Sequence, residues 1–215
     1  TYRQFTETGS VIGGYYAGGQ TATMSYQVTK PAVTINLTTG YLVQVDGVNK
    51  GVYDATTNNK VTFEAPVAGA FYALAQNVDA AANYKTGSIL ATGTSAGQIT
   101  STDRTYQYTV RATDANASGV INLVQVARVT PTAVNVYTAD VNNDGSYDTT
   151  NDSAAWVTSG QYVKVGTTLT MVPASPLAAT KHVQVNSVNV GAAGAASATY
   201  AVKNTDTSLT IGVEP

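Results

Sequence analysis

The sequence contains no cysteine, one histidine and few charged residues, and each shortage excludes a class of function. Without cysteine, the 215-residue chain has neither disulfides nor a thiolate metal site. The single histidine, His182, excludes a metal cluster built from several histidines. Charged residues make up 11% of the chain, less than half of the roughly 25% of an average soluble domain. The net charge of −2 provides no basic surface, so we expect no nucleic-acid partner.

Long apolar runs are absent too. No segment approaches the roughly 20 apolar residues that a membrane helix needs, so we do not expect a membrane-spanning protein. The chain opens on Thr1 without a methionine or a signal-like segment, and we interpret it as a processed product or a fragment of a longer chain. Threonine, serine, asparagine, glutamine, tyrosine and glycine supply the polar surface in place of charge. Such a surface is typical of secreted β-proteins, and we expect an extracellular or cell-surface location.

A hydrophobic period of two residues dominates what is present, and it predicts β-strands. Apolar residues alternate with threonine, serine, glutamine, asparagine or glycine over 21–28, 33–37, 105–110 and 209–213. One apolar and one polar face is the pattern of an antiparallel strand that covers a core on one side. The alanine-rich stretch 77–84 is too short to be a stable helix by its propensity alone. The predicted fold class is therefore all-β, with an antiparallel β-sandwich architecture.

An internal echo suggests that the sandwich is repeated. The sequence V-Q-V-D-G-V-N at 43–49 recurs as V-Q-V-N-S-V-N at 183–189, and strand-like segments flank both copies. Repetition of strand composition alone is the alternative explanation. We favour two related modules that meet where Pro131 interrupts the strand pattern. This interpretation divides the chain into a flexible amino-terminal arm and two β-sandwich modules, at 1–20, 21–130 and 131–215.

Four of the ten aspartates lie in one short segment, 140–152, with the spacing D-x-N-x-D-G-x-x-D-x-x-N-D. Ca²⁺ prefers six to eight oxygen ligands, which alternate side chains of a tightly curled loop supply. A glycine in sixth place permits the sharp turn, and the seventh residue contributes its main-chain carbonyl. Counted from Asp140, this spacing predicts a calcium site with the ligands Asp140, Asn142, Asp144, Ser146, Asp148, Asn151 and Asp152.

The segment resembles the calcium loops of dockerin modules and of thrombospondin type 3 repeats, which share the EF-hand spacing. It departs from them in twelfth place, where Asn151 stands instead of an acidic residue and Asp152 follows. The loop therefore closes either through Asn151 or one residue later. A solvated turn rich in Asp and Asn is the alternative to a metal site. Because four clustered carboxylates repel one another without a cation, we expect bound Ca²⁺.

The sequence contains no motif in the context that catalysis would require. The segment 93–97 matches the G-x-S-x-G pattern of a nucleophile elbow, but the sequence after it is not helical, as that motif requires. We expect His182 to be a side chain at a strand edge. We expect Trp156 to anchor the aspartate loop to the core, with stacking on a sugar ring as the alternative. The chain is therefore not expected to be an enzyme.

The repeated β-modules, the scarcity of charge and the calcium loop together resemble the immunoglobulin-like modules of bacterial and archaeal S-layer proteins. That resemblance implies a non-catalytic structural protein, a self-assembling subunit or fragment of an S-layer or a surface filament stabilised by calcium. Self-association would use strand addition by the arm at 1–20, and a cell-wall glycan is a further expected partner. A carbohydrate-binding or adhesin module and a phage tail or capsid protein are the alternatives.

Overall fold

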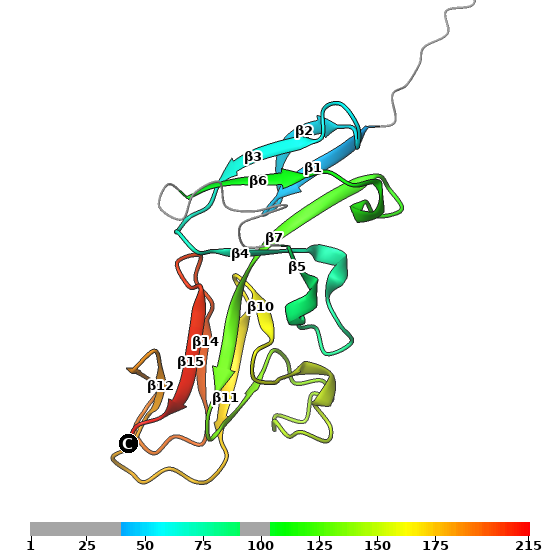
Figure 1. Ribbon diagram of the computed structural model, residues 1–215. Helices are drawn as coiled ribbons and strands as arrows, with labels where there is room; N and C mark the ends of the chain where they lie inside the picture. Colours follow the sequence, from blue (N-terminus) through cyan, green and yellow to red (C-terminus); the bar gives the residue numbers. More distant parts are fainter. Residues whose placement is uncertain (1–39, 91–103) are drawn as a thin grey trace, which may run out of the picture. The chain divides into compact units, whose positions relative to one another are not determined.

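The computed structural model describes residues 40–90 and 104–215, and of Leu90 only the main chain. These residues form fifteen strands, and their helical structure is limited to four 3-10 turns of three residues each (Figure 1). The prediction of an all-β fold is confirmed. The arm at 1–20, the strands predicted at 21–28 and 33–37, and the G-x-S-x-G segment at 93–97 lie outside the described residues.

The elements follow one another closely along the chain. They are β1 (Tyr41–Val45), β2 (Val48–Tyr53), β3 (Lys60–Glu64), β4 (Phe71–Leu74), η1 (Ala75–Asn77), η2 (Thr86–Ser88), β5 (Ile89–Leu90), β6 (Thr105–Thr109), η3 (Ala112–Asp114), β7 (Val120–Pro131), β8 (Val134–Tyr137), η4 (Ser153–Ala155), β9 (Trp156–Val157), β10 (Tyr162–Lys164), β11 (Thr168–Pro173), β12 (Val183–Val185), β13 (Val188–Val190), β14 (Ala198–Ala201) and β15 (Ser208–Val213). Within this part of the chain, no helix is both long enough and apolar enough to cross a membrane.

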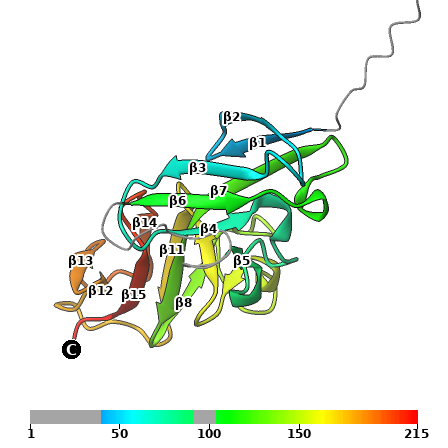
Figure 2. The same cartoon turned by 45° about the horizontal axis from the view of Figure 1, so that its top comes forward.

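The long strand β7 organises the largest sheet. This nine-stranded sheet has the order β13-β12-β15-β7-β1-β2; β4 and β10 also pair with β7, and β5 pairs with β4. The order β14-β11-β8-β9 forms a four-stranded sheet, and β3 pairs with β6. Most pairings are antiparallel, as the alternation predicted, but β1 and β15 both run parallel to β7 (Figures 1 and 2).

Three clusters of buried side chains lie along β7. The first contains Val43, Tyr108 and Ile121 and is built from β1, β3, β4, β6 and the first residues of β7. The second contains Leu209 and extends from the last residues of β7 through β15. A smaller cluster around Val126 joins β4, β7 and β10. The predicted module boundary at 130/131 falls at the end of β7, which contributes side chains to all three clusters.

The two copies of the sequence echo form the same local structure, a hairpin with a two-residue turn. The hairpins are β1–β2 and β12–β13. Both turn residues have positive φ: 50° and 79° at Asp46 and Gly47, and 50° and 65° at Asn186 and Ser187. Positive φ at both positions is characteristic of the type I′ turn, whose twist suits a two-residue hairpin. The echo therefore encodes a hairpin.

The first turn residue of each hairpin also docks it onto the neighbouring strand. The Asp46 Oδ1 atom accepts the Gln125 N–H of β7 at 2.7 Å, and the Asn186 Oδ1 atom accepts the Thr210 N–H of β15 at 2.8 Å. The strand directions nevertheless differ, since β1 is parallel to β7 whereas β12 is antiparallel to β15. The hairpins are thus locally alike and differently placed.

Candidate metal site in the aspartate loop

The aspartate loop connects β8 to β9, which pair with each other at the edge of the four-stranded sheet. Tyr137 and Trp156 are opposite one another in this pairing, and the Thr138 N–H donates to the Ala155 carbonyl at 2.9 Å. The ends of the loop are therefore held together by main-chain hydrogen bonds. This closure fixes the stem from which residues 140–152 project.

The first half of the loop curls as the spacing predicted. Asn143 and Gly145 have φ values of 57° and 81°, the left-handed conformation that a sharp turn needs. The Gly145 N–H donates to Asp140 Oδ2 at 2.9 Å, and the Ser146 N–H donates to Asp144 Oδ1 at 2.7 Å. The Asn142 Nδ2 atom donates to Asp144 Oδ2 at 2.7 Å. The curl thereby brings the Asn142 and Asp144 side chains into contact and ties the Asp140 carboxylate to the main chain at Gly145.

Asp140 has one oxygen in an unusual environment. Its Oδ1 atom is buried and accepts no hydrogen bond in the described part of the structure. A buried carboxylate oxygen without a donor is unfavourable, because it has lost its hydration and gained nothing in exchange. A cation at this position would compensate that loss. Asp140 is also first in the calcium spacing, so sequence pattern and burial indicate the same atom.

Asp152 occupies a different position from the other three aspartates, because it is 0% exposed. Its Oδ1 atom accepts the Val141 N–H at 2.6 Å and its Oδ2 atom accepts the Asp148 N–H at 2.9 Å. Both carboxylate oxygens thus tie together the two halves of the loop. In this conformation Asp152 shapes the loop from inside, a role that the spacing alone did not indicate.

The last part of the loop forms a tight turn around Asp148. Its Oδ1 atom accepts the N–H groups of Thr150 and Asn151, each at 2.8 Å, and its Oδ2 atom accepts the Asn151 Nδ2 at 2.8 Å. The main-chain hydrogen bond from Asn151 is the largest of the effects that lower the pKa of Asp148. Asn151 therefore presents its amide nitrogen, and not its oxygen, to Asp148.

The loop offers oxygen atoms and little else, which restricts its chemistry. In residues 40–90 and 104–215, no group of three or more histidine, cysteine, aspartate or glutamate side chains is arranged to hold a metal ion. A cation here would need a mixed set of carboxylate, carboxamide and main-chain oxygens. Such a set suits a hard cation such as Ca²⁺.

The two other residues singled out by sequence lie outside the curl. Trp156 is half-buried, and its carbonyl accepts Asn83 Nδ2 at 3.0 Å, which ties the end of the loop to a distant segment. His182 lies beside β12, with its Nδ1 atom 3.2 Å from both Glu214 Oε2 and Asn189 Nδ2. The hydrogen bond with His182 is the main cause of the lowered pKa of Glu214.

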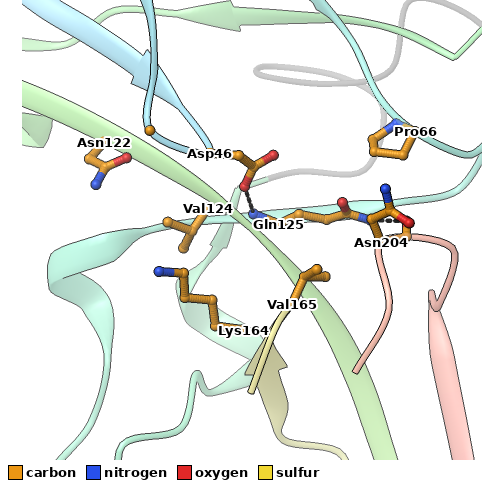
Figure 3. A pocket seen from close by; sticks show the side chains of 9 residues that line it. Asp46, Pro66, Asn122, Val124, Gln125, Lys164, Val165 and Asn204 are labelled. Carbon is orange, nitrogen blue, oxygen red and sulfur yellow. Dashed lines mark hydrogen bonds between the residues drawn. The ribbon is translucent and has the colours of Figure 1, made fainter. Parts of the chain in front are cut away.

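A hollow of about 430 Å³ lies beside β7 where the β1–β2 turn approaches it (Figure 3). Asp46 and Lys164 face this hollow and form no ion pair within the described residues. Burial is the largest influence on Asp46 and raises the pKa of its carboxyl. The Gln125 Nε2 atom donates to the Asn204 carbonyl at 2.8 Å. Sequence reasoning missed the hollow because its lining comes from separate segments that no motif connects.

Comparisons with protein-family models, with curated proteins and with solved structures find no significant match to this chain. The fold and the loop therefore define an all-β protein with an oxygen-rich candidate cation site.

Proposed function

We propose that this chain is a non-catalytic extracellular structural protein, stabilised by one Ca²⁺ ion bound in the loop at 140–152. The observation that carries the proposal is the buried Asp140 Oδ1 atom without a donor, in first place of a calcium-type spacing. The left-handed conformation of Asn143 and Gly145 supports it, because the loop already has the curl that alternate ligands require.

The ligand set that we propose begins with the side chains of Asp140, Asn142 and Asp144. On binding, the hydrogen bond between Asn142 and Asp144 would give way to bonds from their oxygens to the ion. The main-chain carbonyl of Ser146 and the side chain of Asp148 would follow, the latter directly or through water. Asp152 supports this set by holding the loop in shape.

Calcium bound to the folded loop stabilises the protein by mass action, since the unfolded chain has no such site. The effect extends beyond the loop, because Trp156 at its end is hydrogen-bonded to the buried Asn83. Asn83 in turn donates its N–H to Asp79, whose other carboxylate oxygen accepts Gln161 Nε2 at 3.2 Å. Loop and neighbouring segments are thus mechanically connected, as suits a subunit of a load-bearing surface layer.

Calorimetry with and without calcium tests the metal site. We expect Ca²⁺ to raise the melting temperature by several degrees over a chelator, as occurs when a ligand binds only the native state. Asp140→Ala should abolish this increase. Glu64→Gln also removes one carboxylate, outside the loop, and should retain the increase. Equal melting temperatures of the wild type in calcium and in chelator would contradict the proposal.

Assembly is the larger part of the proposed function, and electron microscopy tests it. We propose that copies associate into an S-layer lattice or a surface filament, with strand addition by the arm at 1–20 and a cell-wall glycan as a further contact. Purified protein in calcium should form ordered arrays that disperse in chelator. Monomers at all concentrations and in both conditions would count against a self-assembling subunit.

The alternative functions receive less support. A sugar-binding platform needs exposed aromatic rings, yet every aromatic residue within 40–90 and 104–215 is at least half-buried, Trp156 included. The large apolar side chains exposed in this part are all valines: Val48, Val52, Val78, Val141 and Val188. A phage tail or capsid protein would share the fold and the self-assembly, and genome neighbourhood separates it from a surface-layer protein.

A further inference from the structure

A tyrosine at the base of the aspartate loop has a hydroxyl group with no evident function. Tyr137 is the last residue of β8 and is 0% exposed. Its hydroxyl oxygen is buried and has no hydrogen-bond partner in the described part of the structure. Buried polar groups are nearly always paired, and an exception commonly marks the place of a water or an ion.

Two observations place this hydroxyl at the loop. The Tyr137 ring packs against that of Tyr147, a residue of the loop, with 5.6 Å between the ring centroids. Burial raises the pKa of Tyr137, and the negative charges of Asp148 and Asp152 raise it further, so the phenol lies within the field of both carboxylates. A donor without an acceptor thus belongs to a side chain that packs against the loop.

Asp148 supplies the reason why a water molecule is needed there. Both of its carboxylate oxygens already accept hydrogen bonds from Thr150 and Asn151. In loops of this spacing, the residue in ninth place often acts on the ion through water. Such a water needs two to four polar partners to be held in place. The ion, Asp148 and a phenol hydroxyl would be three.

We propose that Tyr137 is a positioning residue of the cation site, whose hydroxyl donates a hydrogen bond to a water molecule that ligates the ion beside Asp148. This inference rests on the proposed calcium site and adds to it a residue that the loop spacing does not contain. It also explains why a polar group lies in an otherwise apolar position of β8, between the β8–β9 pair and the loop.

The experiment compares Tyr137→Phe with Tyr147→Phe, because both variants lose one hydroxyl and keep the ring. Tb³⁺ serves as the probe of the site, and its luminescence lifetime in H₂O and in D₂O counts the water molecules bound to the ion. We expect Tyr137→Phe to bind Tb³⁺ and Ca²⁺ about tenfold more weakly, as is typical when a group behind the ligands is lost. It should also change the number of bound waters, whereas Tyr147→Phe should leave both values unchanged.

Thermal unfolding provides a second test, because the effect of Tyr137→Phe on the melting temperature should change sign between chelator and Ca²⁺. In chelator, Tyr137→Phe removes an unpaired buried hydroxyl, so its melting temperature should equal or exceed that of the wild type. In Ca²⁺ the order should reverse. If the variant binds Tb³⁺ with unchanged affinity and water count, the inference is wrong while the calcium site stands. If neither the wild type nor Tyr147→Phe binds Tb³⁺ or Ca²⁺, the proposed calcium site is wrong, and with it the inference about Tyr137.

Discussion

At the scale of single residues, the four aspartates of the loop differ in burial: Asp152 is fully buried, Asp140 and Asp148 are partly buried, and Asp144 is exposed. Asp152 is fully buried, and it is accommodated because two main-chain N–H groups solvate its carboxylate in place of water. Asp144, which is exposed, bonds to its own neighbours within the curl. The same residue type therefore has a structural role at position 152 and a proposed ligand role at position 144.

Substitution of these two residues should separate the two roles. Asp152→Asn places an amide group where two donors converge, so we expect a loss of about 2 kcal/mol in the free energy of unfolding. That loss should already be present in chelator, where no ion is bound. Asp144→Asn should leave stability in chelator within about 0.5 kcal/mol of the wild type and abolish the stabilisation by calcium. Urea unfolding in both conditions measures these effects, and an effect of Asp152→Asn that appears only in calcium would identify Asp152 as a ligand.

Gly145 gives a second prediction at this scale. Its φ of +81° is strained for any other residue, although a Cβ atom there would meet no neighbour within 4 Å. Gly145→Ala should therefore cost about 1 kcal/mol through the backbone alone. Gly87 has equally open surroundings and no positive φ, so Gly87→Ala is the matched control and should be neutral. Urea unfolding in chelator measures both, and equal effects would show that the left-handed turn is not needed.

At the scale of elements, the two hairpins use the same turn conformation with different residues, Asp46-Gly47 in the first and Asn186-Ser187 in the second. Asp46 and Asn186 take the same position and make the same hydrogen bond to the next strand. Asp46 carries a charge that Asn186 does not, and its carboxyl faces β7 although the residue as a whole is exposed. The second hairpin thus indicates which substitution the first should tolerate.

We expect Asp46→Asn to stabilise the protein at neutral pH and Asp46→Ala to destabilise it. Asparagine keeps an acceptor for the Gln125 N–H, whereas alanine leaves that N–H unpaired at a cost of about 1 kcal/mol. Asn186→Ala is the matched control, since it removes the equivalent acceptor of the Thr210 N–H. Chemical denaturation checks all three variants, and destabilisation by Asp46→Asn would show that the charge itself is required.

The pH dependence of Asp46→Asn has a definite sign. Burial raises the pKa of Asp46 in the folded state above its ordinary value of 3.8, so the unfolded chain ionises first as the pH rises. Wild-type stability therefore decreases from pH 3.8 upward until the folded-state pKa is passed, and the decrease then ceases. The advantage of Asp46→Asn should be full at neutral pH and disappear below pH 3.8. An advantage that grows toward acid pH would refute this explanation.

At the scale of the described part of the molecule, β7 connects the buried clusters. One strand contributes Ile121 to the first cluster and Val129 to the second, and pairs with β1, β4, β10 and β15. Loss of packing at either end removes partners from the same strand. The clusters should therefore unfold together, even if the echo reflects two related modules.

Cavity-forming substitutions test this coupling. Ile121→Ala and Leu209→Ala each remove a fully buried side chain, one from each large cluster, and each should cost about 3 kcal/mol. Calorimetry should give one unfolding transition that either variant shifts as a whole. Val188→Ala, at a side chain that is 65% exposed, is the control and should shift it little. Two transitions, of which each variant moves only one, would show that the clusters fold independently.

The sequence by itself determined the local features of this protein. Alternation of apolar and polar residues predicted β-strands at 105–110 and 209–213, where β6 and β15 lie, because side chains of a strand point to opposite faces in turn. The echo encodes two hairpins and the aspartate spacing encodes a curl, because turn conformations depend on residues that are adjacent in the chain.

Tertiary structure alone decided which segments become neighbours. A period of two is the same for parallel and antiparallel strands, so it did not show that β1 and β15 run parallel to β7. Nor did the spacing distinguish buried Asp152 from exposed Asp144, or place the Tyr137 ring against Tyr147 of the loop. Burial and pairing depend on contacts between residues far apart in the chain, and no local pattern records them.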